Sequence, residues 1–171
     1  MKRPTFEAAL RDVSAAKSDM RLSAAERLSS PPEDRAGEAA DALATLADDP
    51  SAAVRRSALI GLGQIERKDG AAHLPLVLLR FDDGDPGVRE AAVITAGRLG
   101  GPEAESAIKD ALESHYPEVR FQAVMSTVEL APSDAADSIA RLLDDGDAEV
   151  RAHAAEALGH LGETAAADDL A

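Results

Sequence analysis

Apolar and polar positions along the chain follow one pattern that returns every 31 to 34 residues. A complete copy reads as an acidic turn, then Val-Arg, then an Ala three residues after the Arg, and the fourth copy has Ser114 in place of the turn Asp. The first copy is weaker, because Met20 replaces the Val. The arginines that mark the five copies are Arg21, Arg55, Arg89, Arg120 and Arg151. A period of this length across the chain is typical of a solenoid, in which each repeat packs only against its neighbours.

The residues after each acidic turn have the periodicity of an α-helix, here called helix B. Counted from the Val, apolar or small residues stand at offsets 0, 4, 8 and 11. In the second copy these residues are Val54, Ala58, Leu62 and Ile65. At 100° per residue the four positions fall within about 80° of one another, so they form one buried stripe. Strand-like alternation does not compete with this pattern.

A second helix, helix A, is expected before each turn. The five predicted A helices span residues 5–16, 33–47, 70–81, 102–113 and 133–144. Pro75 should kink or delay the third of them, because proline disrupts a helix interior. Asp85 and Asp147 stand where an N-cap of helix B belongs. Gly100 and Gly162 stand just beyond helix B, where glycine often forms a C-cap.

The pattern predicts a single solenoid domain over residues 1–171. Its units are expected at about residues 1–31, 32–66, 67–100, 101–131 and 132–162, followed by a short C-terminal cap at 163–171. The segment after Gly162 looks like the opening of a further helix A, so it is either this cap or the start of a longer array. In the first unit Lys17-Ser18-Asp19 replaces the acidic turn, which fits an N-terminal cap.

Two copies of the motif carry a resemblance to a known family. Residues 82–92 read Asp-Asp-Gly-Asp-Pro-Gly-Val-Arg-Glu-Ala-Ala, and residues 144–155 read Asp-Asp-Gly-Asp-Ala-Glu-Val-Arg-Ala-His-Ala-Ala. With the unit length and two helices per unit, they resemble HEAT repeats, in the short form often called HEAT-like or phycobilisome-lyase-type repeats. The resemblance spans residues 5–162. It implies an all-α fold, an α-α superhelix of about five helix pairs with a short C-terminal cap helix.

The resemblance also implies a structural ladder between adjacent repeats. In this family the Asp of the turn and the Arg of helix B form ion pairs that hold the stack together. Carried over to this chain, the ladder takes Asp49, Asp83 and Asp145 together with Arg55, Arg89 and Arg151. Arg120 has Ser114 where the Asp should be, so we expect an interruption there. Each exposed pair contributes only about 0–1 kcal/mol, and its role is stacking, not catalysis.

The chain is strongly acidic and its charge is uneven. Lys and Arg number 18 against 32 Asp and Glu, a net charge of −14. Residues 1–30 carry +2, so residues 31–171 carry −16. Such a surface repels phosphates, which argues against a nucleic-acid partner. The acidity fits either a basic protein partner or a halophile-like composition that keeps the surface well solvated; the even spread of acids favours the second explanation.

Other sequence features limit where the protein is expected in the cell and which kinds of chemical site it can contain. The chain has no cysteine, which excludes disulfides, thiolate chemistry and Cys-ligated zinc. No run of 18 or more apolar residues is present, so no membrane span or membrane partner is predicted. The N-terminus continues into polar Thr5-Phe6-Glu7 and does not look like a secretory signal. We therefore expect a cytoplasmic protein.

Catalytic members of the wider family carry signatures that this chain lacks. Iron-dependent deoxyhypusine hydroxylases have His-Glu dipeptides on their helices, and none of the four histidines here precedes Glu. His153 and His160 could share a face of the last helix B, but without a near third ligand they make a weak metal site. The sequence therefore predicts no enzyme, no metal and no cofactor. A phycobilisome-lyase-like enzyme that handles a chromophore or cofactor, or an assembly factor, is the alternative.

Helix B also carries apolar residues on the side that points away from its buried stripe. Offsets 2 and 6 should face the concave side of the solenoid and be polar, yet several are large and apolar. The candidate partner-binding residues, apolar ones first, are Ile60, Ile94, Met125, Phe121, Arg56, Glu90 and Glu156. Burial of each apolar side chain in a partner is worth about 1.5–3 kcal/mol. The alternative is that adjacent B helices half-cover them.

These observations predict a non-enzymatic scaffold or adaptor for protein–protein interaction. It would bind a peptide or protein on the concave face formed by the B helices. A purely structural role is a further hypothesis, in which the basic first 30 residues of one copy meet the acidic remainder of another. The oligomeric state stays open.

Overall fold

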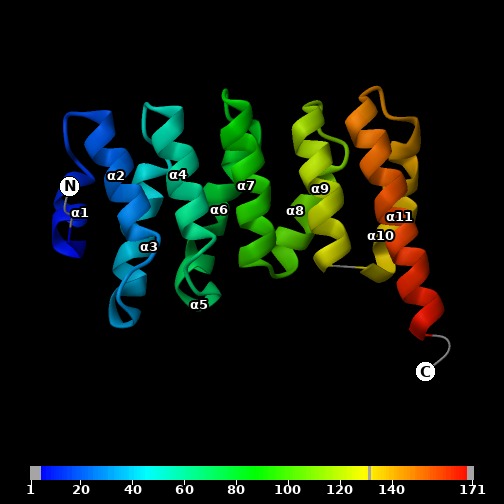
Figure 1. Cartoon of the computed structure of the whole chain (residues 1–171), viewed down its shortest axis with the longest axis horizontal. Coiled ribbons are helices and arrows are strands. Elements are labelled where there is room, and N and C mark those ends of the chain that lie inside the picture. The colour runs from blue at the N-terminus through cyan, green and yellow to red at the C-terminus, as the bar shows by residue number, and fades with distance from the viewer. Residues whose placement is uncertain (1–4, 131, 169–171) are drawn as a thin grey trace. The chain divides into compact units, whose positions relative to one another are not determined.

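The fold is given by a computed structural model, which describes residues 5–130 and 132–168. Throughout these residues the chain forms helices and turns, without a β-strand (Figure 1). The fold class is the all-α repeat architecture that the periodicity predicts. None of the described helices combines the length and apolar character needed to cross a membrane.

The chain packs as two compact units, Met1–Gly100 and Gly101–Ala171. The boundary coincides with the one that the sequence places between its third and fourth repeats. Gly100 and Gly101 have φ values of 60° and 97°, which side chains other than glycine rarely adopt. These two glycines end one helix and allow the next to start almost at once.

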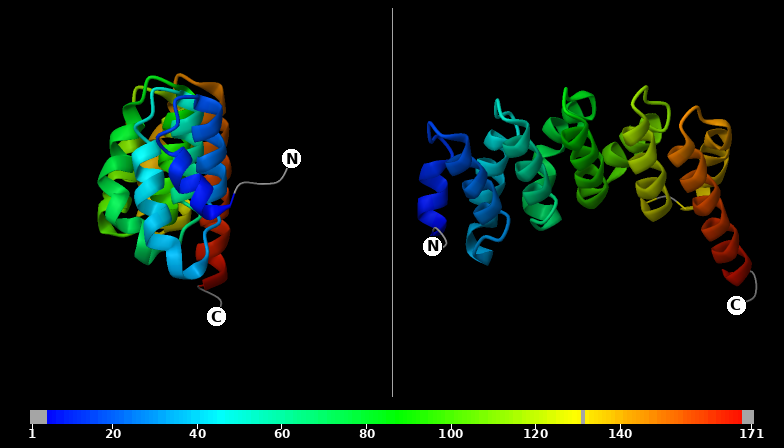
Figure 2. Two further views of the ribbon diagram at one scale, coloured as in Figure 1. Left: turned by 90° about the vertical axis from the view of Figure 1, so that its left-hand side faces the viewer. Right: turned by 45° about the horizontal axis from the view of Figure 1, so that its top comes forward.

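The first unit consists of three helix pairs. The A positions hold α1 (Phe6–Asp12), α3 (Ala36–Leu46, preceded by the 3₁₀ turn Glu33–Arg35), and the segment α5 (Arg67–Gly70), η2 (Ala71–His73), α6 (Leu74–Leu79) and η3 (Arg80–Asp82). The B helices are α2 (Ser18–Leu28), α4 (Ala52–Leu62) and α7 (Pro86–Leu99). α4 packs between α2 and α7, as Figure 1 and the right-hand view of Figure 2 show.

The second unit consists of two helix pairs. Its A positions hold α8 (Pro102–Ala111) and α10 (Pro132–Ala140), with η4 (Arg141–Asp144) extending α10. Its B helices are α9 (Pro117–Leu130) and α11 (Ala148–Asp168), which pack against each other. The B helices of the chain are thus α2, α4, α7, α9 and α11.

Capping residues and proline act as the sequence predicts at several helix starts. The backbone N–H of Val88 donates to Oδ1 of Asp85 at 3.1 Å, and that of Val150 donates to Oδ1 of Asp147 at 3.2 Å. Pro75 lies in the first turn of α6, where its missing N–H costs nothing. The third helix A is therefore broken into short pieces before the proline.

The last B helix does not end at Gly162, so that prediction is wrong. α11 continues to Asp168 and includes residues expected to begin a separate cap. A glycine ends a helix when it adopts a positive φ, and among the described residues only Gly100 and Gly101 do so. Residues 169–171 of the predicted cap lie outside the described residues.

The buried stripe of helix B forms the core. In α4, Val54, Ala58 and Leu62 are fully buried, and Ile65 just beyond it is 6% exposed. Leu43 of α3 packs under α4 so closely that a Cβ at Gly61 would lie 3.0 Å from its Cδ2. Glycine at position 61 therefore lets the A and B helices of this pair approach each other.

Replacement of Leu43 by Ala should lower the free energy of unfolding by about 2–5 kcal/mol, because it leaves a cavity in a fully buried site. The matched control is Leu79→Ala, since the Leu79 side chain is 71% exposed. The control should change stability by less than about 0.5 kcal/mol. Urea unfolding followed by circular dichroism measures both, and equal effects of the two variants would contradict the packing described.

Candidate functional site

The acidic turn before each B helix is shaped by the Asp side chain. Oδ1 of Asp83 accepts the backbone N–H of Asp85 at 3.0 Å, two residues further on. Asp49 and Asp145 make the same contact with the second residue after them, both at 2.8 Å. An Asp side chain that binds its own backbone in this way replaces a backbone turn. The turn thus holds its carboxylate at a defined position.

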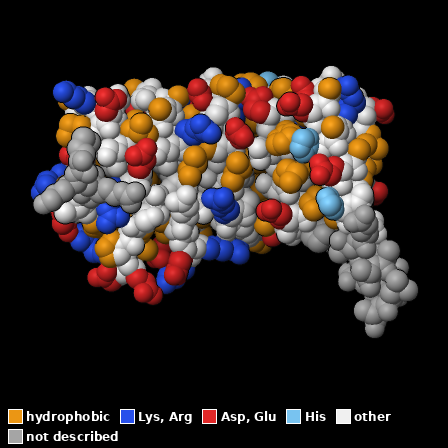
Figure 3. All heavy atoms as spheres, in the orientation of Figure 1, with side chains coloured by type: hydrophobic (Ala, Val, Ile, Leu, Met, Phe, Trp, Pro, Cys, Tyr) orange, Lys and Arg blue, Asp and Glu red, His pale blue; other side chains and the backbone are white. Residues whose placement is uncertain are grey.

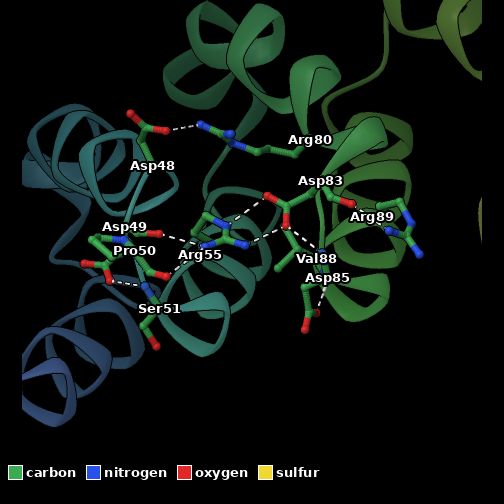
Figure 4. A network of polar contacts seen from close by, with 10 residues as sticks. All are labelled: Asp48, Asp49, Pro50, Ser51, Arg55, Arg80, Asp83, Asp85, Val88 and Arg89. Carbon is green, nitrogen blue, oxygen red and sulfur yellow. Dashed lines mark hydrogen bonds and ion pairs between the residues drawn. The ribbon is translucent and has the colours of Figure 1, made fainter.

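The Arg of helix B is anchored to the turn of its own repeat (Figure 4). Nη1 of Arg55 donates to the carbonyl oxygen of Asp49 at 2.9 Å, six residues before it. Arg89 makes the same bond to Asp83 at 2.6 Å, and Arg120 to Ser114 at 2.7 Å. This bond orients the guanidinium, so that its Nε and Nη2 edge faces out of the repeat.

That edge binds the carboxylate of the following repeat. Nε of Arg55 donates to Oδ2 of Asp83 at 2.9 Å, and Nη2 donates to Oδ1 at 2.6 Å. Arg120 holds Asp145 in the same way, with both distances at 2.7 Å. Arg21 also pairs with Asp49 through both nitrogens. Two parallel charge-assisted hydrogen bonds fix the orientation of the two side chains as well as their distance. Each Arg–Asp pair therefore sets how two adjacent repeats are aligned.

The ion pairs join adjacent repeats as expected, but the expected interruption at Arg120 is wrong. Each turn carboxylate takes the Arg of the preceding repeat, while the Arg of its own repeat binds the turn carbonyl. Arg120 is not interrupted, because its partner is Asp145 and not the residue at position 114. Ser114 keeps one role of the Asp: its hydroxyl accepts the N–H of Tyr116 at 3.2 Å, but it has no carboxylate to offer.

The ion pairs between repeats lower the pKa of their aspartates. The hydrogen bonds from Arg21 lower the pKa of Asp49, and those from Arg120 lower the pKa of Asp145. For Asp83, burial alone would raise the pKa, but the hydrogen bond from Arg55 and the N–H of Asp85 bring it below its usual value. All three carboxylates are therefore held in the charged form.

A second ion pair joins the second and third repeats, and here the third repeat supplies the arginine and the second supplies the aspartate. Arg80, at the end of the third A segment, forms an ion pair with Asp48 of the preceding turn (Figure 4). Deeper in the packing, the Thr95 hydroxyl of α7 donates to the carbonyl oxygen of Leu59 in α4 at 2.8 Å. The contact between α4 and α7 thus has polar restraints at its turn end and along its length.

The outer surface of α4 and α7 carries four of the candidate binding residues. Ile60 is 38% exposed and Ile94 is half-buried. They line a hollow of about 60 Å³ whose charged lining residues are Arg56, Glu90 and, in addition to the candidates, Arg98. Figure 3 shows hydrophobic side chains over these two helices with basic and acidic side chains around them. The predicted apolar positions therefore lie together on one surface of the first unit.

The outer surface of α9 and α11 carries the other three. Met125 is 45% exposed, Phe121 is half-buried, and Glu156 lies on the exposed part of α11. The ring of His153 meets the edge of Phe121, with centroids 4.2 Å apart at 64°. Figure 3 shows histidine beside hydrophobic side chains on this surface.

His153 and His160 do not form a metal site with the residues around them. Nδ1 of His153 lies 3.0 Å from the carbonyl oxygen of Glu149, and Nε2 of His160 lies 4.0 Å from Oε1 of Glu156. Within the part of the chain that the structure describes, no three His, Asp or Glu side chains gather as metal ligands.

Arg98 and His153 also contribute to these surfaces. They were not selected from the sequence, although the repeat pattern contains a signal for each. Arg98 stands at offset 10 of its B helix, which continues the i, i+4 series of offsets 2 and 6. His153 stands at offset 3, next to the same strip, and its contact with Phe121 depends on how α9 and α11 pack. The predicted strip falls into two parts, one in each compact unit.

Comparison with known proteins identifies the repeat. A family model described as HEAT repeats matches residues 40–127 and 106–171, which together cover most of the chain. The chain belongs to the HEAT repeat family. No curated protein matches the sequence.

Several solved structures share the fold of this HEAT-repeat protein. The Escherichia coli protein YibA has a TM-score of 0.72 at 20% identity, over 90% of this chain and 58% of that one. The complex of CpcE and CpcF of phycocyanin lyase from Nostoc sp. PCC7120 has a TM-score of 0.69 at 23% identity, over 95% and 67%. A designed armadillo repeat protein in complex with the peptide (KR)4 has 0.59 at 18%, over 90% and 80%. At these identities the likeness shows the fold alone.

Replacement of Asp83 by Asn should lower the free energy of unfolding at neutral pH by about 1–3 kcal/mol, because Arg55 loses its charged acceptor. The pKa of Asp83 in the folded state lies below its ordinary value of 3.8. Its stabilisation is therefore complete above that ordinary value and is lost as the pH falls through the lower folded-state pKa.

Urea unfolding at pH 7 and at about pH 3 measures this contribution, and the gap between wild type and Asp83→Asn should narrow in acid. Asp82→Asn is the control, because Asp82 is the exposed neighbour in the same turn. A constant gap at both pH values would show that the Asp83 carboxylate does not stabilise the fold through its charge.

Proposed function

We propose that this HEAT-repeat protein is a non-enzymatic interaction module that binds a peptide or protein on the outer surface of its B helices. The observation that carries the proposal is the pair Ile60 and Ile94 on α4 and α7, apolar where the repeat pattern calls for polar residues. Arg56, Glu90 and Arg98 surround this pair. An apolar centre with a charged rim is the common anatomy of a protein interface.

The free energy gained by burying a few apolar side chains is large enough to give useful affinity. Complete burial of an Ile or Met side chain is worth about 1.5–3 kcal/mol relative to exposure. Binding energy in interfaces is concentrated in a few central apolar and aromatic residues, with charged residues at the rim giving orientation and specificity. The two isoleucines can serve as such a centre in the first unit, and Phe121 with Met125 can do so in the second.

The distribution of charge suggests the chemistry of the partner. Residues 101–171 contain 16 Asp and Glu against four Lys and Arg, a net charge of −12, whereas residues 1–100 carry −2. Of the four basic residues, Arg120 is held in the ladder and Arg141 lies 3.6 Å from Glu113. The second unit therefore favours a partner with a basic surface. The same charge disfavours nucleic acid.

A chromophore-handling function like that of a phycobilisome lyase has weaker support. A hollow of about 650 Å³ lies between α8 and the α10–η4 segment. Charged side chains dominate its lining: Lys109, Asp110, Glu113, Asp137 and Arg141. A site for a large conjugated ligand is expected to be mainly apolar and aromatic. Aromatic residues make up only 2% of this chain.

Replacement of Ile60 by Glu and, separately, of Met125 by Glu tests which unit binds. Capture of a partner by the immobilised wild type, followed by titration of that partner, should give an affinity at least about tenfold weaker for the variant in the binding unit, since a charge is placed in an apolar centre. Leu79→Glu is the control, because Leu79 is 71% exposed and belongs to α6, which occupies an A position and not a B position.

Circular dichroism should show unchanged helicity in all three variants. Equal affinity of Ile60→Glu, Met125→Glu and wild type would reject the B-helix surface as the binding site. A coloured ligand that copurifies with the wild type in stoichiometric amount would favour the lyase-like alternative instead.

A further inference from the structure

Two arginines lie at opposite ends of the hollow between α4 and α7. Arg56, in the first half of α4, reaches the start of α7, where a Cβ at Gly87 would lie 3.4 Å from its Cδ. Arg98, in the last turn of α7, reaches the end of α4, where a Cβ at Gly63 would lie 3.3 Å from its Cδ. Each arginine stem therefore packs on the neighbouring helix at a glycine and leaves its charged head group in solvent.

The guanidinium groups of these two arginines differ from those that link the repeats. Arg55 and Arg80 bind carboxylates of adjacent repeats. Arg56 and Arg98 are exposed, and neither guanidinium forms a hydrogen bond or an ion pair with the residues that the structure describes. Both cations are therefore available to a carboxylate of another molecule.

The hollow between the two arginines combines an apolar centre with an excess of positive charge. Its volume of about 60 Å³ suits a single side chain, and Ile60 and Ile94 provide the apolar lining. Glu90 contributes a carboxylate, against the two guanidinium groups of Arg56 and Arg98. Figure 3 shows Lys and Arg side chains beside hydrophobic ones over α4 and α7. This surface is therefore locally basic in a chain whose net charge is −14.

Helix geometry gives the distance that a ligand of both arginines must span. Arg56 and Gly63 are seven residues apart, and Gly87 and Arg98 are eleven apart. At about 1.5 Å per residue, the two ends of the surface are about 10 to 16 Å apart. An extended chain covers this distance with about three to five residues. In such a chain residues i, i+2 and i+4 point to the same side, so three alternate side chains can contact the surface together.

We propose that the surface of Arg56, Ile60, Ile94 and Arg98 binds an extended segment of a partner protein with the pattern acidic, any, apolar, any, acidic. The central apolar side chain enters the hollow between the isoleucines, and each carboxylate accepts hydrogen bonds from one guanidinium. This inference rests on the proposed function and defines the partner chemistry of the first unit. At physiological salt, charges more than about 8 Å away are largely screened, so the local arginines outweigh the acidic charge elsewhere in the chain.

Selection from a random peptide library on the immobilised wild type tests the predicted pattern. We expect Asp or Glu to be enriched on both sides of Leu, Ile, Met or Phe, with the two acidic residues about three to five positions apart. An enriched peptide is then titrated against wild type and against Arg56→Glu/Arg98→Glu. Its affinity for the double variant should be at least about tenfold weaker, and its affinity for wild type should fall as salt is added.

A charge exchange separates recognition from any effect on folding. The same peptide with Lys in place of its acidic residues should bind Arg56→Glu/Arg98→Glu more tightly than it binds wild type. Arg11→Glu/Lys17→Glu is the matched control, because it makes the same change in net charge at exposed positions of the first repeat. The control should bind the acidic peptide within about twofold of wild type. Circular dichroism checks that all variants are helical.

The inference is overturned if no peptide is enriched, if the enriched peptides lack the acidic residues, or if Arg56→Glu/Arg98→Glu binds as wild type does. Ile60→Glu distinguishes this failure from that of the proposed function. Neutral or basic peptides that lose affinity for Ile60→Glu would retain the surface as a binding site and reject only the acidic partner. Peptides unaffected by Ile60→Glu would reject the surface itself.

A second copy of this acidic chain is the other possible source of the segment. Sedimentation velocity of wild type and Arg56→Glu/Arg98→Glu distinguishes the two sources. We expect both proteins to sediment alike. Self-association of wild type that the double variant loses would overturn the assignment to a different protein.

Discussion

The bidentate ion pair between a B-helix arginine and the turn aspartate of the next repeat is the interaction on which the stacking of the repeats depends. One guanidinium binds its own turn through Nη1 and the following turn through Nε and Nη2, as Arg55 does with Asp49 and Asp83. The aspartate in turn shapes the start of its own B helix. Turn geometry and repeat stacking are therefore not independent, since both use the same carboxylate. Ser114 separates the two roles, because it keeps the turn and lacks the charge.

The helix pairs could be predicted from the sequence because burial of a stripe every 3.6 residues leaves a strong periodic pattern. Which aspartate pairs with which arginine could not be predicted from the sequence. Arg55 follows Asp49 by six residues and precedes Asp83 by 28. The short spacing recurs in other repeats, and the long one recurs as 28 residues from Arg21 to Asp49 and as 25 from Arg120 to Asp145. Periodicity alone does not decide which of them is the ion pair. The end of α11 was also predicted wrongly, because whether a glycine such as Gly162 adopts the left-handed C-cap conformation depends on the chain around it.

The candidate surface was predicted in part. The offsets correctly place Ile60 and Met125 on exposed positions, since these depend only on the helix to which each belongs. Arg98 and His153 join the surface through packing between two B helices, which no single helix pattern contains. The division after Gly100 was visible only as a repeat boundary, because a change in contact density leaves no periodic trace in the sequence.

The unequal sharing of charge between residues 1–100 and 101–171 has a consequence for the rate of encounter. A cationic protein would feel attraction chiefly from residues 101–171 while still at a distance. Its arrival would then be fast at low ionic strength and slow as salt screens the field, whereas its departure, governed by short-range apolar contact, would change little. In the proposed interaction, the acidic charge would set which proteins associate quickly, and the exposed apolar side chains would set how slowly they dissociate.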